Sequence, residues 1–159
     1  MRARPEKGFT LVELCIVLVL LSILLRLGLP AVQSMVTRAR AAQAIGDLNV
    51  IREAAVAYHA ANGTWPAEAG VATIPPGLAP YLPKGYSFTR NQYELDWQNW
   101  ALPTGLPSNP QRLVLLGVSV VTTDAELGQA VLKLIAGSSP TRTGANQYTM
   151  VLVASTDPL

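Results

Sequence analysis

The chain has 159 residues and a formal net charge of +2, and half of its residues are hydrophobic. Residues 1–8 hold three of the twelve Lys and Arg side chains and one of the ten Asp and Glu side chains, which leaves nine cations and nine anions in the remainder. This balance excludes a broad basic face, so we expect no nucleic-acid partner. The single cysteine also excludes an intramolecular disulfide.

The chain begins with a basic segment and continues with a long apolar run. Arg2, Arg4 and Lys7 precede this run, and by the positive-inside rule they hold the N-terminus in the cytoplasm. The run contains one carboxylate, Glu13, and a charged side chain inside hydrocarbon costs at least about 2.5 kcal/mol. Glu13 therefore needs a partner or a function.

Residues 8–14 read Gly-Phe-Thr-Leu-Val-Glu-Leu, and this segment resembles the N-terminus of type IV pilins and type II secretion pseudopilins. The resemblance is close over about residues 6–32 and looser as far as Pro66. It implies that a prepilin peptidase cleaves the chain after Gly8. It also implies that the same enzyme methylates the new amino terminus, at Phe9.

The resemblance also implies roles for two further positions. Glu13 would stand near the start of the mature chain, where the family uses a glutamate in filament assembly. Pro30 falls where many members carry a helix-loosening proline, and Gly28 adds to the predicted helix break, because proline lacks an amide donor and glycine weakens a helix. The alternative is an uninterrupted helix that lacks one hydrogen bond.

The apolar run has nearly the length of a membrane span. Residues 9–25 form about 25 Å of helix at 1.5 Å per residue, slightly less than a bilayer core of roughly 30 Å, and continuation to Val32 fills the difference. Arg26 then lies near the outer interface, where its long side chain reaches the head groups. An ordinary secretory signal peptide is also basic and then apolar, but residues 26–30 offer no small-residue cleavage site.

The helical period continues from Ala31 to about Ala61 in an alanine-rich segment. Apolar residues recur there in steps of three and four, which predicts a helix face that packs on a globular domain. Asn62 and Gly63 then end the helix. The members of this stripe are Ala41, Ala44, Leu48, Ile51, Ala55 and Tyr58.

The segment after the long helix is rich in Pro and Gly, so most of residues 67–110 is expected to be loop. Two short alternating segments, 86–88 and 93–97, predict a hairpin within it. Residues 113–121 are apolar except for two positions and predict a buried strand with a bulge near Gly117.

Residues 123–126 read Thr-Asp-Ala-Glu, a capping-box pattern that predicts the start of a short helix. Residues 138–146 are expected to be loop, and residues 147–154 alternate as a final strand. The fold class is therefore α+β, pilin-like: a long N-terminal helix, membrane-embedded in its first half, packed on a small, mainly antiparallel sheet with one extra short helix. The apolar positions of the short helix are Leu127, Ala130, Val131, Leu134 and Ile135.

Few residues offer chemistry. Cys15 lies in the apolar run, where a thiol is cut off from water, and His59 has no carboxylate or nucleophile spaced to work with it. Helix capping explains Asp124 and Glu126, and Asp157 lies in the tail, so no loop gathers the oxygen ligands of a calcium site. We expect no enzyme activity, no metal and no cofactor.

We therefore predict a cleaved leader at residues 1–8, a transmembrane or filament-core helix at 9–32 and a globular domain at 33–159. The expected function is that of a structural subunit of a type II secretion pseudopilus or a type IV pilus. The alternative is a low-abundance minor pilin whose domain binds a surface, DNA or a secreted protein at a filament tip. The residues do not distinguish a pilus from a pseudopilus.

The expected partners follow from the same resemblance. They are other pilin or pseudopilin subunits, the prepilin peptidase, the inner-membrane assembly platform and the lipid bilayer. We expect a single pass through the inner membrane with the C-terminal domain in the periplasm, and then a periplasmic or extracellular filament.

Overall fold

A computed structural model describes residues 9–100, 112–136 and 140–157. The chain forms two compact units, Met1–Val36 and Thr37–Leu159. One helix, α1 (Leu11–Asn62), begins in the first unit and ends in the second.

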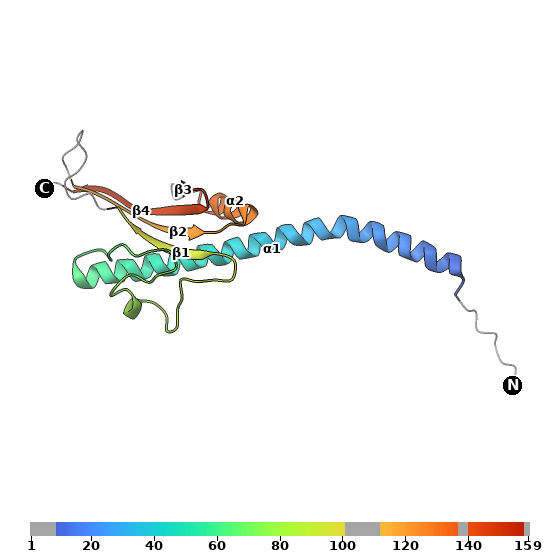
Figure 1. Cartoon of the computed structure of the whole chain (residues 1–159), viewed down its shortest axis with the longest axis horizontal. Helices are drawn as coiled ribbons and strands as arrows, with labels where there is room; N and C mark the ends of the chain where they lie inside the picture. The colour runs from blue at the N-terminus through green and yellow to red at the C-terminus, as the bar shows by residue number, and fades with distance from the viewer. Residues whose placement is uncertain (1–8, 101–111, 137–139, 158–159) are drawn as a thin grey trace. The chain divides into compact units, whose positions relative to one another are not determined.

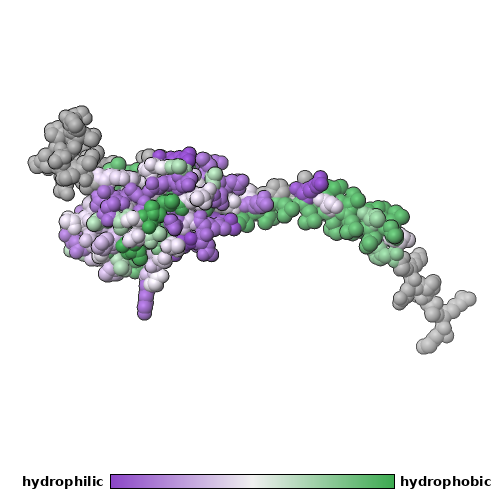
Figure 2. All heavy atoms as spheres, in the orientation of Figure 1, coloured by the Kyte–Doolittle hydropathy of each residue, from purple (hydrophilic) through white to green (hydrophobic). Residues whose placement is uncertain are grey.

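The first unit consists of the N-terminal part of α1. Its large apolar side chains are exposed, and Figure 2 shows much of its surface as hydrophobic. α1 stays helical through Gly28 and Pro30, as in the uninterrupted alternative, and the helix break stays a prediction for an assembled state. Within the part of the chain that the structure describes, no helix combines the length and the apolarity needed to cross a membrane.

The second unit is built on one four-stranded sheet, whose order is β1-β2-β4-β3 and whose neighbours are all antiparallel (Figure 1). A register shift between Leu116 and Gly117 of β2 confirms the predicted bulge. The α+β fold class is also confirmed. The strands are β1 (Glu94–Asn99), β2 (Arg112–Val121), β3 (Pro140–Gly144) and β4 (Gln147–Asp157), with α2 (Ala125–Leu134) after β2 and the 3-10 turn η1 (Ala79–Tyr81) before β1.

The core of the second unit lies between α1 and one face of the sheet. Ala41, Ala44, Leu48, Ile51 and Ala55 of the predicted stripe are fully buried. They belong to the same hydrophobic cluster as alternate residues of β1 and β2, since side chains of a strand point to opposite faces. The sheet residues in this cluster include Leu95, Trp97, Leu116, Val118 and Val120.

Two predicted strand boundaries were wrong. Residues 86–88 do not form a strand: the hairpin contact is reduced to an isolated bridge between Thr89 and Glu94 and a hydrogen bond from Leu95 N to Phe88 O of 2.8 Å. Part of the predicted loop at 138–146 is instead the edge strand β3. Its Thr and Gly composition is typical of a turn, but pairing with β4 fixes an extended backbone.

The short helix α2 begins one residue later than the capping-box pattern predicted. Asp124, and not Thr123, is the N-cap, and its Oδ1 accepts hydrogen bonds from Glu126 N and Leu127 N at 3.0 and 3.1 Å. Leu134 was wrongly placed in the core: it is 54% exposed, whereas Gly128 is buried.

Gly128 is required by the packing of α2 on β4. A Cβ atom at this position would lie 2.1 Å from Tyr148 Cζ, far inside van der Waals contact. The ring of Tyr148 therefore rests directly on the α2 backbone.

Candidate functional site

The start of α1 is formed by the N-terminal motif. α1 begins at Leu11, and Thr10 precedes it with its Oγ1 accepting a hydrogen bond from Glu13 N at 3.2 Å. Thr10 O also accepts from Leu14 N at 3.2 Å. Thr10 thus caps the helix and satisfies amides that have no partner within it.

Thr10 and Glu13 have the spacing of a capping box, which the sequence analysis overlooked although the pattern was readable. Glu13 lies in the first turn, where a carboxylate is stabilised by the positive end of the helix dipole. This location gives Glu13 a local structural role in addition to the one implied by the family. Gly8, the predicted cleavage position, lies outside the described residues.

The surface around Glu13 is apolar. Phe9 is 75% exposed and Leu11 80%, and exposed apolar side chains continue along the helix to Val36. No described residue forms an ion pair with the Glu13 carboxylate. Cys15 is exposed on the same helix. An apolar surface this long exceeds what a soluble monomer normally leaves in water, so it needs a cover of lipid or protein.

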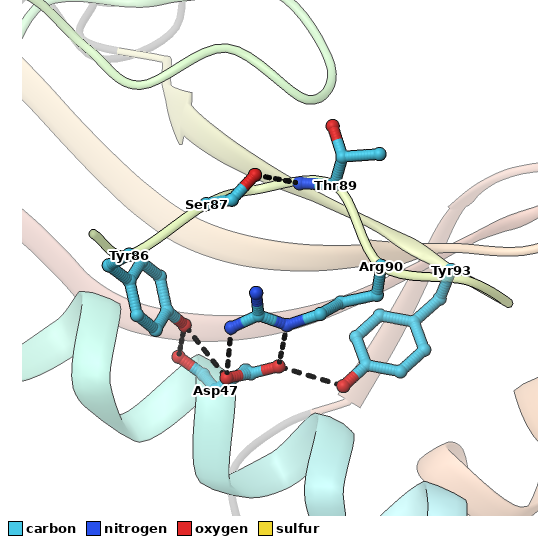
Figure 3. A network of polar contacts seen from close by, with 6 residues as sticks. All are labelled: Asp47, Tyr86, Ser87, Thr89, Arg90 and Tyr93. Atoms are coloured by element: carbon cyan, nitrogen blue, oxygen red, sulfur yellow. Dashed lines mark hydrogen bonds and ion pairs between the residues drawn. The ribbon is translucent and has the colours of Figure 1, made fainter.

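A second notable site joins α1 to the segment before β1, and Figure 3 shows it. Asp47 of α1 accepts hydrogen bonds from Arg90 Nε (2.8 Å, to Oδ2), Arg90 Nη2 (2.9 Å, to Oδ1), Tyr93 Oη (2.7 Å) and Tyr86 Oη (3.0 Å). The guanidinium of Arg90 also lies 4.8 Å from the centre of the Tyr86 ring. We call these four residues the Asp47 cluster.

Hydrogen bonding decides the electrostatics of the Asp47 cluster. Burial alone would raise the pKa of Asp47, but donation from Arg90, Tyr93 and Tyr86 outweighs it, so the pKa lies below its ordinary value. Burial and the neighbouring carboxylate raise the pKa of both tyrosines, which stay neutral donors. The hydrogen bond to Asp47 is the main reason that the pKa of Arg90 rises.

Asp96 of β1 lies in a different environment. It is 2% exposed, and its Oδ2 accepts hydrogen bonds from Gln98 Nε2 and, at 2.9 Å, from Gln147 Nε2. Its Oδ1 is buried without a hydrogen-bond partner. Burial, and to a smaller extent the charge of Glu68, raises the pKa of Asp96 to about 6.

The remaining candidate residues have structural environments. The imidazole of His59 stacks on the Trp65 ring with centroids 4.1 Å apart, and Asp124 caps α2. Asp157 lies at the end of β4. Among the described residues, no three His, Cys, Asp or Glu side chains are grouped closely enough to hold a metal ion.

Comparison with known proteins agrees with the motif at the start of α1. The prokaryotic N-terminal methylation motif matches residues 3–25. The chain is 36% identical over 74 residues to the fimbrial protein EcpC of Eikenella corrodens. This match covers 46% of this chain and 48% of EcpC. It is 40% identical over 73 residues to the type IV major pilin protein PilE1 of Neisseria gonorrhoeae, covering 44% of each chain.

A secretion protein is similar to the same extent. The type II secretion system core protein G of Pseudomonas aeruginosa is 38% identical over 66 residues, covering 42% of this chain and 46% of that protein. The chain spans less than half the length of each of these three relatives. No solved structure matches the chain.

The chain thus combines a methylation motif at the head of a long helix with a following α+β unit. Over less than half of its length it is similar to type IV pilins and to a type II secretion system core protein.

Proposed function

We propose that the chain is a structural subunit of a type IV pilus or a type II secretion pseudopilus. The observation that carries this proposal is the set of exposed apolar side chains between Phe9 and Val36, which begins within the methylation motif matched at residues 3–25. Such a surface is stable only when lipid or other subunits cover it. We assign no reaction to the chain, because its relatives are filament proteins by name.

The proposal divides the chain into three parts. Residues 1–8 are a leader that prepilin peptidase removes after Gly8, and Phe9 becomes the methylated amino terminus. Residues 9–32 anchor the subunit in the inner membrane and later form the filament core, where helix weakness at Gly28 and Pro30 permits melting. Residues 33–159 fold on the outer side of the membrane, and an assembly platform inserts the subunit into the filament.

In the filament, we assign Glu13 to the amino group of Phe9 in a neighbouring subunit. Both charges would lie in apolar surroundings, and removal of one partner from a buried pair costs about 3 to 5 kcal/mol. Pairing within one chain is the alternative, because Phe9 precedes Glu13 by only four residues, at the same end of α1. The structure gives Glu13 a further, local stabilisation through the first turn of α1, which both arrangements retain.

Mass spectrometry of the protein from its native host tests processing. We expect a mature chain that begins with N-methylated Phe9. Gly8→Val should block cleavage more strongly than the matched variant Gly8→Ala, if the peptidase requires a small residue there. An uncleaved wild-type chain, or one cut beyond Leu25, would contradict the proposed function.

Competition between subunits tests Glu13. Glu13→Ala and Glu13→Gln are each expressed together with wild-type protein, and their share in sheared filaments is compared with their share in the membrane. We expect both variants to be processed and to be depleted from filaments. Incorporation at the wild-type level would refute the intersubunit role and favour pairing within one chain.

A further inference from the structure

The turn formed by residues 89–93 stands between two hollows on the surface of the second unit. One hollow, of about 400 Å³, lies between this turn and Arg40 and Gln43 of α1. The other, of about 370 Å³, lies between the same turn and a surface that includes Glu94 and residues 121–123. We call them the Arg40 hollow and the Glu94 hollow.

The turn between the hollows is held on both sides. Arg90 is bound to Asp47 of α1 by two hydrogen bonds on the side of the Arg40 hollow. On the other side, Thr122 Oγ1 donates a hydrogen bond of 2.8 Å to Gln92 O. Arg90 N also donates to Tyr93 O at 3.0 Å, which closes the turn. The turn is therefore a rigid wall shared by the two hollows. Such a preorganised surface binds a partner in one geometry at a lower entropic cost.

The two hollows carry opposite charges. In the Arg40 hollow, Asp47 neutralises Arg90, and no described acidic residue pairs with Arg40. Arg90 also lines the Glu94 hollow, but it is already paired with Asp47, and among the described residues the exposed Glu94 carboxylate has no ion-pair partner. Asp124, which directly follows Thr123 of that hollow, adds a second negative charge, although it is partly used in capping α2.

We propose that these hollows are the two halves of a lateral contact between neighbouring copies of this chain, in which Arg40 of one copy pairs with Glu94 of the next. The inference rests on the proposed filament function. Two different surfaces that complement each other make a heterologous contact, and such a contact repeats into an open helical array when the rotation does not close a ring. The second unit balances eight Lys and Arg side chains, Arg40 among them, with eight Asp and Glu side chains, which is too little net positive charge for a nucleic-acid footprint, so a second copy is the occupant that the charges favour.

Charge reversal tests the pairing in the full chain. Arg40→Glu and Glu94→Arg, each expressed with wild-type protein, should each be depleted about tenfold from sheared filaments relative to the membrane pool, which corresponds to about 1.4 kcal/mol. The double variant Arg40→Glu with Glu94→Arg, expressed alone, should regain assembly because each copy again meets an opposite charge. Arg52→Glu is the matched control, since Arg52 is an exposed α1 arginine that lines neither hollow.

The outcomes separate this inference from the function on which it rests. A wild-type chain that is absent from filaments would overturn both. Filaments that incorporate Arg40→Glu as readily as wild type, or a double variant that does not recover, would overturn the lateral pairing alone. Thermal melts of each variant show whether its fold is intact, and a variant that melts like wild type cannot owe its depletion to misfolding.

Crosslinking measures the same contact without reversing either charge. Cysteines replace Arg40 and Glu94 in a Cys15→Ser background, and filaments are treated with a short bis-maleimide. A ladder of crosslinked species longer than dimers is expected, because each copy contributes one half of two contacts. Filaments that yield no crosslinked species would contradict the pairing.

Discussion

Two aspartates of the second unit show how differently a folded chain can treat the same side chain. Asp47 lies on α1 and receives four hydrogen bonds, two of them from a guanidinium. Asp96 lies on β1, is almost fully buried, and receives donors from two neutral amides at only one of its oxygens. The first environment lowers the carboxyl pKa and the second raises it.

The comparison shows that hydrogen-bond donors and a cation, rather than depth of burial, decide whether a carboxylate stabilises the fold. Desolvation opposes ionisation at both positions. Only at Asp47 do charged and phenolic donors outweigh it. We therefore expect the Asp47 cluster to hold the second unit together and Asp96 to cost it stability at neutral pH.

The largest expected effect is that of Asp47→Ala. Removal of the carboxylate leaves Arg90 and two tyrosine hydroxyls without their acceptor. The free energy of unfolding should fall by about 3 kcal/mol. This value is at the lower end for a buried ion pair, because the Arg90 side chain is 25% exposed. Denaturant unfolding of the full chain in detergent, followed by tryptophan fluorescence, measures it. Glu53→Ala, an exposed change on the same helix, serves as the control, and an equal loss in both variants would refute the special role of Asp47.

The next effect separates the two tyrosines of the cluster. Tyr93→Phe should destabilise the chain by about 1.5 kcal/mol, because its hydroxyl donates to a charged acceptor at 2.7 Å from a buried ring. Tyr86→Phe should cost less, because its hydrogen bonds to Asp47 Oδ1 and O are longer, at 3.0 and 3.2 Å, and its ring is only partly buried. The same unfolding assay applies. The reverse order of the two losses would show that ring packing, and not the hydroxyl, dominates.

A smaller gain is expected from Asp96→Asn. The amide removes a buried charge while one of its atoms can still face Gln98 or Gln147, so stability at pH 7.5 should rise by about 1 kcal/mol. Asp96→Ala is the comparison, since it removes the charge but also opens a void. A loss of stability in Asp96→Asn would mean that the ionised carboxylate has a favourable partner.

The pH dependence of stability should have opposite signs at the two aspartates, with a slope below about 1.4 kcal/mol per pH unit for each group. Because the folded pKa of Asp96 is about 6 and its ordinary value is 3.8, the native state holds its proton more tightly, and stability falls as pH rises from about 4 to 6. The lowered pKa of Asp47 acts in the other direction, and its contribution is lost as pH falls below the ordinary value. Asp96→Asn should abolish the first trend and Asp47→Ala the second; unchanged profiles would contradict the assignments.

Local patterns predicted much of the fold. The stripe from Ala41 to Ala55 was readable because helical periodicity sets which face is buried, and the β2 bulge was readable from Gly117 in an apolar run. The edge strand β3 was missed because its residues favour turns and its extended form depends on pairing with β4. Sequence also predicted the N-terminal motif, whose residues are contiguous.

The two aspartate environments could not be predicted in the same way. Asp47 and Arg90 are 43 residues apart in the chain, and nothing local to either indicates the other. Asp96 occupies the alternate position of β1 that a strand pattern assigns to solvent, but its neighbours on the sheet face bury it. Such contacts depend on register and on how helix and sheet approach each other, which only the folded chain defines.

The contacts between α1 and its own domain have a mechanical consequence for a filament under tension. They are spread along the C-terminal part of the helix. The first is the Asp47 cluster, the second is the Tyr58 ring against Tyr81 with centroids 5.7 Å apart, and the third is Asn62 Nδ2 to Tyr81 Oη at 3.2 Å at the end of the helix. A pull along the helix axis loads such contacts together in shear, whereas a pull at the outer edge of the sheet would open them one after another. The domain should therefore resist axial force far better than a sideways tear, and the rate of forced unfolding should depend on the direction of the load.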